Sequence, residues 1–402
     1  MAGSFISPDG DIESLYITDY NLIDRYVTTG TAWGWGLNSF GQVGDNTSTT
    51  KSSPVLVTGG GQNWKSVTAG LRLMAGIKTD GTLWMWGSNQ YGGIGNSTTA
   101  NSFSSPVQTV AGGTNWKMCF VGNDHTVAIK TDGTLWTWGL NTTGALGDNT
   151  QTHASSPIQT IAGGTNWKNC SATYQSSYGI KLDGTLWAWG SNANGQLGVG
   201  NTVARSSPTQ VANGGTTWKT LSTPGGSYQG MAAIKTDGTL WAWGANNYWQ
   251  LGTGDTTVRN SPVQNTYGGN WKYIITTTRQ SAGIKTDGTL WVWGQNSNGN
   301  LGTNDITNYS SPVQTIAGGT DWRTVAMSGV TSSFWTGAIK TDGTLWVWGT
   351  PSTNGQMGTN STTPQSSPVQ TIAGGKNWKQ ISIGTNTGLA LYFYDAGDLY
   401  PK

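Results

Sequence analysis

The fold is decided by a stretch that runs from Ile129 to Gly139 and reads IKTDGTLWTWG. Its final part, Trp-x-Trp-Gly, recurs along the whole chain at intervals of 50 to 55 residues. The first tryptophan of each copy is Trp33, Trp84, Trp136, Trp187, Trp241, Trp291 and Trp346. Seven copies at a nearly constant spacing predict a repeat architecture, in which each copy is one structural unit.

Each unit of about 50 residues predicts four short antiparallel strands and no helix. Alternating apolar residues form strands on both sides of an Asp-Gly turn, where aspartate bonds the local backbone and glycine takes a positive φ. Pro157 confines its own segment to an edge strand or a strand start. In the third copy the expected elements are Val127–Lys130, Leu135–Trp138, Ser155–Ile161 and the start of the next unit at Trp167–Cys170.

A four-stranded unit with tryptophans on one face cannot bury that face by itself, whereas a ring of such units buries each face against the next. The sequence therefore predicts an all-β fold: a single seven-bladed β-propeller of four-stranded antiparallel blades, spanning residues 29–402. The repeated tryptophans are expected to be structural. Blade 1 begins with only its last two strands, so strands at the C-terminal end, around Trp378–Ile383 and Leu389–Tyr394, are expected to complete it. Leu22–Val27 is a rival for one of them.

The repeat resembles that of the regulator of chromosome condensation family. The resemblance rests on Asp-Gly-Thr-Leu-Trp-x-Trp-Gly, followed by a Gly-Gln-Leu-Gly element and Ser-Pro-Val, and it covers about residues 30 to 390. Gly195–Gly198 reads GQLG and Gly41–Gly44 reads GQVG. The resemblance implies a seven-bladed propeller. That family usually carries Gly-x-x-His-Thr before the second strand, and only Gly122–Thr126 keeps it here.

The composition limits the classes of function that the sequence supports. Charged residues make up 10% of the 402 residues and the net charge is +2, which provides no general electrostatic footprint for nucleic acid. No apolar stretch is long enough to span a membrane, and no signal peptide is visible at the start of the sequence. Cys119 and Cys170 occupy equivalent positions in adjacent blades and are expected to be buried, unbridged thiols.

Thirteen of the 21 basic residues recur with the repeat, in two sets that we expect on one face of the ring. One set precedes the hairpin turn: Lys78, Lys130, Lys181, Lys235, Lys285 and Lys340. The other follows the single tryptophan that opens each unit: Lys65, Lys117, Lys168, Lys219, Lys272, Arg323 and Lys379. A solvated rim balanced by the turn aspartates is the favoured interpretation, and an anion-binding face is the alternative.

No catalytic set is found. The chain has two histidines and one glutamate, without metal-ligand spacing, a phosphate loop or a nucleophile elbow. The repeated aspartates are explained by turn chemistry. We therefore predict no catalytic residues, no metal site, no cofactor and a protein that is not an enzyme.

Departures from the repeat indicate a binding site. Blades 5 and 7 lengthen the loop between their first two strands, and blade 5 carries aromatic residues in the loop between its last two. These loops emerge on one face, with an arginine on the matching loop of blade 6. The predicted ligand-contacting patch comprises Tyr228, Tyr248, Trp249, Arg279, Phe334 and Trp335. Aromatic residues and arginine on adjacent loops are typical of binding hot spots. Local gap filling by these rings is the competing interpretation.

Residues 1–28 do not fit the repeat and form an acidic arm with apolar anchors, expected to contact another chain or to dock on the propeller. Thr-, Asn- and Gly-rich blades with few charges are similar to propellers found among phage virion proteins. The predicted function is a virion-associated binding or structural protein, an adhesin or a surface decoration, that contacts protein or glycan. The expected location is the virion, or otherwise the cytoplasm. The alternative is an intracellular protein-interaction scaffold or regulator, as in the nucleotide-exchange branch of the family.

Overall fold

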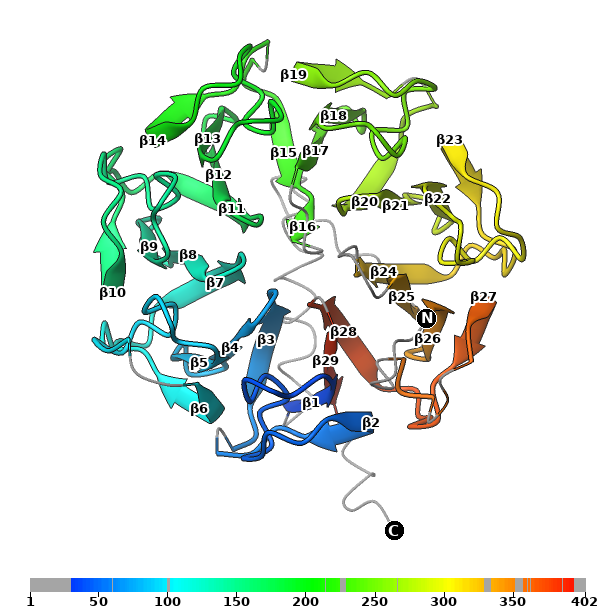
Figure 1. The fold of residues 1–402 in the computed structure, drawn as a ribbon, viewed down its shortest axis with the longest axis horizontal. Coiled ribbons are helices and arrows are strands. Elements are labelled where there is room, and N and C mark those ends of the chain that lie inside the picture. Colours follow the sequence, from blue (N-terminus) through cyan, green and yellow to red (C-terminus); the bar gives the residue numbers. More distant parts are fainter. Residues whose placement is uncertain are drawn as a thin grey trace, which may run out of the picture.

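The structure is a computed structural model. It describes residues 30–393 except 60, 100–101, 214, 225–228, 266, 329–333, 351–356, 360, 362 and 385. Seven antiparallel sheets are arranged radially around a central axis, as Figure 1 shows. The predicted seven-bladed propeller is confirmed. The acidic arm 1–28 and the site residue Tyr228 lie outside the described residues.

Every blade has the same strand order from the axis to the rim. The inner strands are β3 (Trp64–Ala69), β7 (Trp116–Val121), β11 (Trp167–Ala172), β15 (Trp218–Leu221), β20 (Trp271–Thr276), β24 (Trp322–Met327) and β28 (Trp378–Ile383). The second strands are β4 (Leu73–Lys78), β8 (His125–Lys130), β12 (Ser176–Lys181), β17 (Gly230–Lys235), β21 (Gln280–Lys285), β25 (Phe334–Lys340) and β29 (Thr387–Phe393).

The paired tryptophans lie on the third strands, and the Ser-Pro segments form the outer ones. The third strands are β5 (Leu83–Gly87), β9 (Leu135–Gly139), β13 (Leu186–Gly190), β18 (Leu240–Gly244), β22 (Leu290–Gly294), β26 (Leu345–Thr350) and β1 (Gly30–Gly36). The outer strands are β6 (Phe103–Gln108), β10 (Ala154–Gln159), β14 (Arg205–Gln210), β19 (Arg259–Gln264), β23 (Tyr309–Gln314), β27 (Gln365–Gln370) and β2 (Lys51–Leu56). A short additional strand, β16 (Thr223–Pro224), pairs in parallel with β20.

Blade 1 is closed by both ends of the repeat region, because its sheet has the order β2-β1-β29-β28. Thr31 pairs with Tyr392 and Trp33 with Ala390. The C-terminal strands therefore take the two inner places, as expected. The second-strand place, for which Leu22–Val27 was the rival, is held by β29. The join removes the unpaired edge that would otherwise end the ring.

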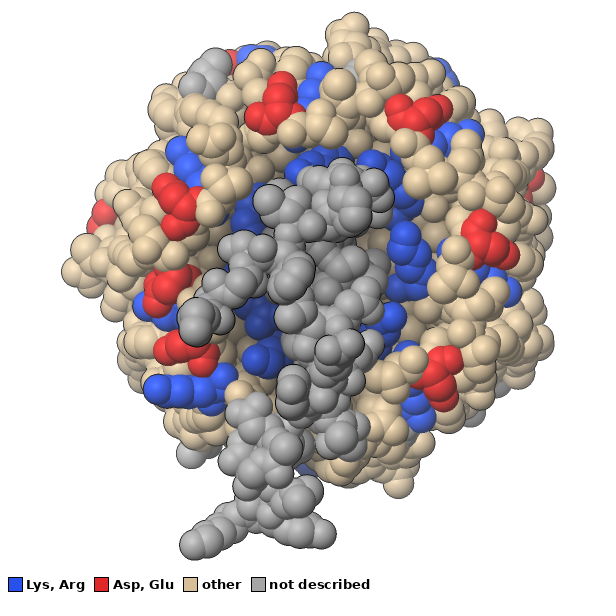
Figure 2. Space-filling model, turned by 180° about the vertical axis from the view of Figure 1, so that it is seen from behind, with Lys and Arg blue, Asp and Glu red and all other residues tan. Residues whose placement is uncertain are grey.

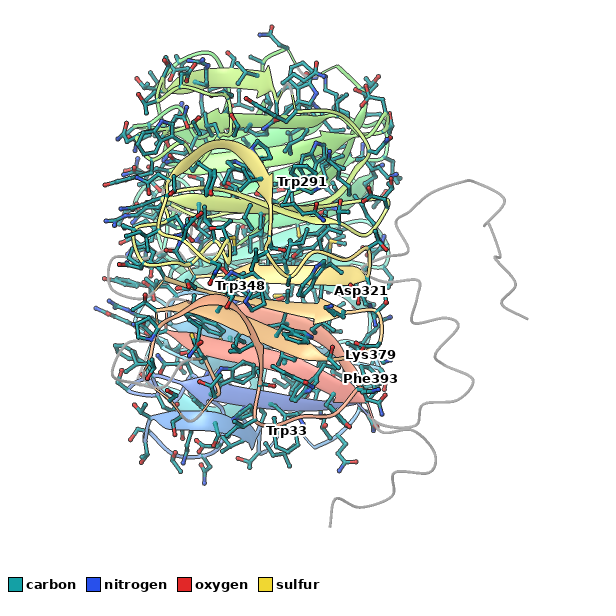
Figure 3. The ribbon with its side chains drawn as sticks, turned by 90° about the vertical axis from the view of Figure 1, so that its right-hand side faces the viewer. Trp33, Trp291, Asp321, Trp348, Lys379 and Phe393 are labelled. Carbon is teal, nitrogen blue, oxygen red and sulfur yellow. The ribbon has the colours of Figure 1, made fainter. Side chains whose placement is uncertain are left out.

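The ring has two distinct faces. The first, the hairpin face, carries the turns between second and third strands and the beginnings of the inner strands. Figure 2 shows this face, with Lys and Arg around its middle and Asp and Glu further out. Figure 3 places Lys379, Asp321 and Phe393 toward this side. The second, the loop face, carries the loops from inner to second strands and from third to outer strands.

The two tryptophans of each pair have different environments. The second of each pair is fully buried. In blades 2 to 7 it packs against the inner-strand tryptophan of its own blade, as for Trp86 and Trp64, whose ring centroids are 5.9 Å apart. The first is half-buried, and in blades 2 to 7 a lysine ammonium from the second strand lies over its ring, at 4.1 Å for Lys78 and Trp84. Six such lysines precede the hairpin turn, so the cation–π contact covers what the sheets leave exposed.

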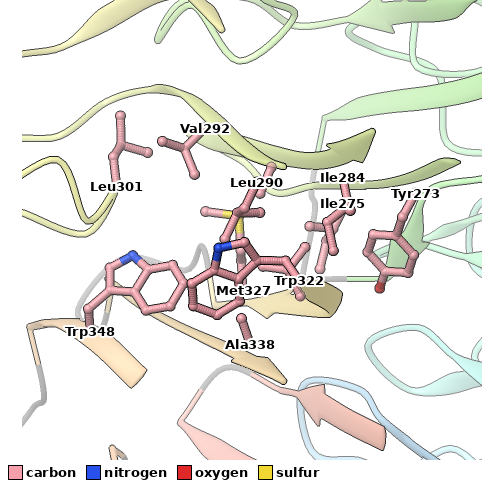
Figure 4. Packing of buried hydrophobic residues seen from close by; sticks show 12 residues of the cluster. Tyr273, Ile275, Ile284, Leu290, Val292, Leu301, Trp322, Met327, Ala338 and Trp348 are labelled. Carbon is pink, nitrogen blue, oxygen red and sulfur yellow. The ribbon is translucent and has the colours of Figure 1, made fainter. Parts of the chain in front are cut away.

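Apolar clusters fill the space between neighbouring blades. Figure 4 shows the one between blades 6 and 7, where Leu290 and Val292 of β22 face Trp322 of β24 and Trp348 of β26. Cys119 and Cys170 lie in such clusters as buried free thiols, as predicted. Within the described part of the chain, no helix is long and apolar enough to cross a membrane.

Removal of a second tryptophan of a pair should destabilise the propeller strongly. Trp189→Ala leaves a cavity and removes the hydrogen bond from the indole to Ala145 O, so we expect a loss of about 3–5 kcal/mol in the free energy of unfolding. Urea unfolding followed by fluorescence measures this. Trp187→Ala, which removes a half-buried ring from the same strand, is the control and should cost clearly less. Equal losses would contradict the assigned difference between the two positions.

His125 should make stability depend on pH. Burial lowers the pKa of His125 to about 4, whereas an unfolded histidine titrates near 6.5. Between about pH 6.5 and 4 the histidine of the unfolded chain binds a proton, whereas His125 in the folded chain stays neutral. The contribution of neutral His125 to the free energy of unfolding is therefore complete above about pH 6.5 and is lost as the pH falls toward 4. The total corresponds to about 3 kcal/mol. In urea unfolding at pH 7.5 and 4.5, His125→Gln should remove most of the slope, and an unchanged slope would contradict the assignment.

Candidate binding site on the loop face

The loops between third and outer strands share one rigid scaffold. In blade 1 the Asn38 amide nitrogen donates to Asp45 Oδ1, Thr47 O and Thr49 O at 3.0–3.1 Å, while its Oδ1 accepts from Val43 N at 2.8 Å. The equivalent asparagines, Asn89, Asn141, Asn192, Asn246 and Asn296, repeat this arrangement. An amide donor thus occupies the centre of each oxygen cage, the place that a cation would take. Among the described residues no group of histidine, cysteine, aspartate and glutamate suits a metal.

Three of the predicted site residues form one cluster, which we call the arginine cluster. The Arg279 guanidinium lies 4.8 Å from the ring centroid of Tyr248 and 5.1 Å from that of Phe334. The three residues come from blades 6, 5 and 7, so the cluster joins three neighbouring blades. Arg279 and Tyr248 are half-buried, and Phe334 is 7% exposed.

Hydrogen bonds fix the loops that carry the arginine cluster. The side chain of Gln250 accepts from Tyr248 N at 2.9 Å and donates to Thr278 O at 2.9 Å, which ties the blade 5 loop to the blade 6 loop. Arg279 Nη1 donates to Gln295 Oε1 at 3.3 Å, and the Thr277 hydroxyl closes the turn by donating to Gln280 O. The guanidinium is therefore held between its two rings by well-ordered neighbours.

Trp249 is half-buried and holds a backbone φ of 60°, in the left-handed region that favours glycine. Glycine stands at this repeat position in Gly41, Gly92, Gly144, Gly195 and Gly299, all with positive φ. A Cβ on any of those glycines would lie closer than 3.0 Å to the outer strand of the next blade. Blade 5 thus retains a strained, bulky residue where its counterparts have none. Retained strain of this kind is an indication of function.

Trp335 does not belong to the binding surface, contrary to its prediction as a ligand contact. Its side chain is 0% exposed and packs against Trp35 of blade 1, with ring centroids 6.3 Å apart. Trp335 pairs with Gly349 in the register in which His125 pairs with Gly139. It therefore fills the inward position that His125 fills in blade 3, and the competing interpretation of gap filling holds for this residue.

A second arginine pairs with an aromatic ring at the equivalent place in blades 1 and 2. Arg72 lies 5.2 Å from the Phe40 ring centroid. Phe40 and Tyr248 share one repeat position, directly before the Gly41 and Trp249 position. Arg72 and Arg279 likewise share the position opposite the glycine that ends the third strand. Phe40 and Arg72 were not among the residues predicted from the sequence, although their loop positions match those of Tyr248 and Arg279 when the blades are aligned.

Replacing the strained tryptophan should stabilise the fold. Trp249→Gly relieves the positive φ and should raise the free energy of unfolding by about 1 kcal/mol, as urea unfolding would measure. The matched control is Gly195→Ala at the same repeat position in blade 4, where the new Cβ would meet Asn260 and lower stability. A loss of stability in Trp249→Gly would show that this ring serves local packing.

Family models match almost the whole described propeller. The RCC1-like domain matches residues 26–334, and the regulator of chromosome condensation (RCC1) repeat matches residues 342–391. The ultraviolet-B receptor UVR8 of Arabidopsis thaliana is 28% identical over 235 residues, which cover 58% of this chain and 52% of the receptor. The mitochondrial RCC1 domain-containing protein RUG3 of the same plant is 26% identical over 258 residues, covering 58% of this chain and 54% of RUG3. The chain thus spans about half the length of these relatives.

Solved structures share the fold at low sequence identity. Prp20p from Saccharomyces cerevisiae superposes with a TM-score of 0.81 at 15% identity, covering 99% of this chain and 97% of Prp20p. Human WBSCR16 superposes with a TM-score of 0.75 at 17% identity, covering 91% of this chain and 99% of WBSCR16. Together with the domain match over residues 26–334, these findings show that the chain belongs to the family of RCC1-like β-propellers.

Proposed function

We propose that the chain is a non-enzymatic, protein-binding propeller that contacts its partner through the arginine cluster and Trp249 on the loop face. The observation that carries the proposal is the Arg279 guanidinium held between the rings of Tyr248 and Phe334. Arginine and aromatic side chains dominate the binding energy of protein interfaces. A guanidinium held by well-ordered neighbours also loses little conformational freedom when a partner binds.

The named relatives favour an interaction scaffold over a virion component. The structure of Prp20p was reported with its binding properties to Gsp1p and histones, and another structure contains Kap60 bound to yeast RCC1. HERC2 of Homo sapiens, named an E3 ubiquitin-protein ligase, matches over 240 residues at 25% identity, which is 5% of that ligase. None of these names refers to a virion or a glycan. We therefore place the interaction-scaffold interpretation ahead of the phage interpretation, and a protein partner ahead of a sugar.

We propose that the protein is not an enzyme because its ionisable side chains are hydrogen-bonded within turns or buried between blades. Asp132, like the other turn aspartates, accepts hydrogen bonds from the hydroxyl and the amide of Thr134 in its own turn. His125 is fully buried, and Nε2 lies 3.1 Å from the hydroxyl of Ser177 in the next blade. These groups are already used by the fold, which leaves them poorly placed for proton transfer to a substrate.

A site-specific photo-cross-linker tests the proposed contact. A benzophenone amino acid replaces either Tyr248 or Asn194, which occupies the same repeat position in blade 4, in the full chain expressed in its native cells. We expect a covalent adduct with a partner protein from position 248 and little from position 194, with the partner identified by mass spectrometry. Equal adducts from both positions, or none, would argue against a contact at the arginine cluster.

Binding assays with the purified partner then measure how much Tyr248 and Arg279 contribute to the binding energy. Tyr248→Ala combined with Arg279→Ala should weaken binding by about 2 kcal/mol or more, which is roughly 30-fold in the dissociation constant. The control combines Asn194→Ala with Gln175→Ala, which change the same two repeat positions in blade 4. It should leave the affinity within about two-fold. Unchanged binding in the first variant, with both proteins folded, would refute the assigned hot spot.

A further inference from the structure

Seven basic residues encircle the axis on the hairpin face, opposite the candidate site. We call them the axial basic ring: Lys65, Lys117, Lys168, Lys219, Lys272, Arg323 and Lys379. Each directly follows the tryptophan that opens an inner strand, and each is half-buried. Figure 2 shows Lys and Arg gathered around the middle of this face.

A β-bulge places each of these residues outside the regular ladder. In blade 4, Trp167 pairs with Lys181 and Asn169 with Ile180, so that Lys168 is the extra residue on its strand. The same irregularity follows the opening tryptophan in all seven blades. Bulges redirect a side chain away from its sheet. Seven positive charges are thereby collected at the strand edges nearest the axis.

Within the described part of the chain, no ion pair engages five residues of the ring: Lys65, Lys117, Lys168, Lys219 and Arg323. The ion pairs Lys51–Asp45, Arg259–Asp255 and Lys340–Asp321 lie away from these five residues. The turn aspartates are engaged elsewhere: hydrogen bonds from Thr134, helped by the charge of Lys130, hold the pKa of Asp132 below its usual value. The lysines that serve those turns are the ones lying over tryptophan rings, and they are separate from the axial basic ring.

The chain enters the propeller on this same face. Gly30, the first residue of β1, pairs with Phe393, and its carbonyl accepts from Asn63 N at 3.0 Å. Asn63 lies two residues before Lys65, so the residues that precede Gly30 join the propeller beside the axial basic ring. Those residues carry five acidic side chains against Arg25: Asp9, Asp11, Glu13, Asp19 and Asp24.

We propose that the axial basic ring is a binding site for the chain's own acidic segment, residues 1–28. Charge complementarity and the shared face identify this occupant. Single exposed ion pairs are weak, but several pairs on one tethered segment act together, at an effective concentration in the millimolar range of roughly 1 mM or more. The aspartates further out on the face repel a broad polyanion such as a nucleic-acid duplex and leave room for a narrow acidic strand at the centre.

Carbodiimide cross-linking of the full chain tests the proposal, because it joins a carboxylate directly to a neighbouring amine. We expect cross-links between the acidic residues of 1–28 and Lys65, Lys117, Lys168 or Lys219. A mixture of unlabelled and ¹⁵N-labelled protein distinguishes links within one chain from links between chains. Raising NaCl from about 0.05 M to 0.5 M should reduce the yield at least about five-fold, because salt screens exposed charges.

Charge variants test whether the axial basic ring is responsible for the cross-links. Lys168→Gln with Lys117→Gln and Lys219→Gln should lower the yield at Lys65, the remaining ring lysine of this group, by about five-fold. The matched control adds three charges further out on the same face through Val110→Glu, Ile161→Glu and Ile316→Glu, which are all exposed. It produces the same change in net charge and should leave the yield within about two-fold.

A charge exchange makes the test independent of folding defects. Asp9→Lys, Asp11→Lys and Glu13→Lys should abolish links from those three positions, and the same should follow from Lys117→Glu, Lys168→Glu and Lys219→Glu. Combining the two sets should restore links in the reverse direction, from lysine on the arm to glutamate on the ring. Absence of links, links to sites away from the ring, no restoration, or links only between labelled and unlabelled chains would each overturn the proposal.

Discussion

The fold depends on a hydrogen bond that joins a buried indole to the blade before it. In blades 2 to 6 the indole of the second paired tryptophan donates to a loop carbonyl of the preceding blade, as Trp138 does to Gly93 O at 2.8 Å and Trp243 to Gln196 O at 2.8 Å. The bond satisfies a buried donor in an apolar interface, where an unpaired one would be costly. It also fixes the height and orientation of neighbouring blades, because both partners belong to rigid elements.

The same contact restricts the loops that could carry function. A Cβ at Gly95 would lie 2.7 Å from the indole nitrogen of Trp138, so the end of each Gly-Gln-Leu-Gly loop must approach the next blade as bare backbone. The asparagine cage then holds the rest of the loop in one shape. Variation is left to the residues just before this glycine-dependent contact, and this is where Phe40, Tyr248 and Trp249 stand.

The fold could be predicted from the sequence because each of the seven copies of the repeat indicates the same four-stranded unit. The Asp-Gly turns, the Pro-containing edge strands and the split blade all follow from local chemistry. The site was predictable only in part. Tyr248, Arg279 and Phe334 meet because their loops emerge side by side, which the repeat spacing indicates. Trp335 could not be placed, because a shift of one residue in the start of β25 decides whether its ring faces solvent or the core.

The repeated lysines show the same limit of pattern reading. Both sets recur once per blade, and nothing in their spacing separates them. The lysines before the turn lie over tryptophan rings, whereas those after the inner tryptophan are displaced by a bulge toward the axis. The difference arises from strand pairing between residues about 14 positions apart, as Trp167 and Lys181 show, and a one-letter pattern does not report it.

The pairing of β1 with β29 also determines when the ring can close during synthesis. Thr31 and Tyr392 are hydrogen-bonded across 361 residues, and β1 leaves the ribosome long before its partner exists. Contacts of such sequence separation form late, because the loop that they close is entropically costly. Six blades can form in order during synthesis, but the ring remains an open arc with an exposed β1 edge until β28 and β29 emerge. The nascent chain is consequently most exposed to edge-to-edge misassembly just before synthesis of the propeller is complete.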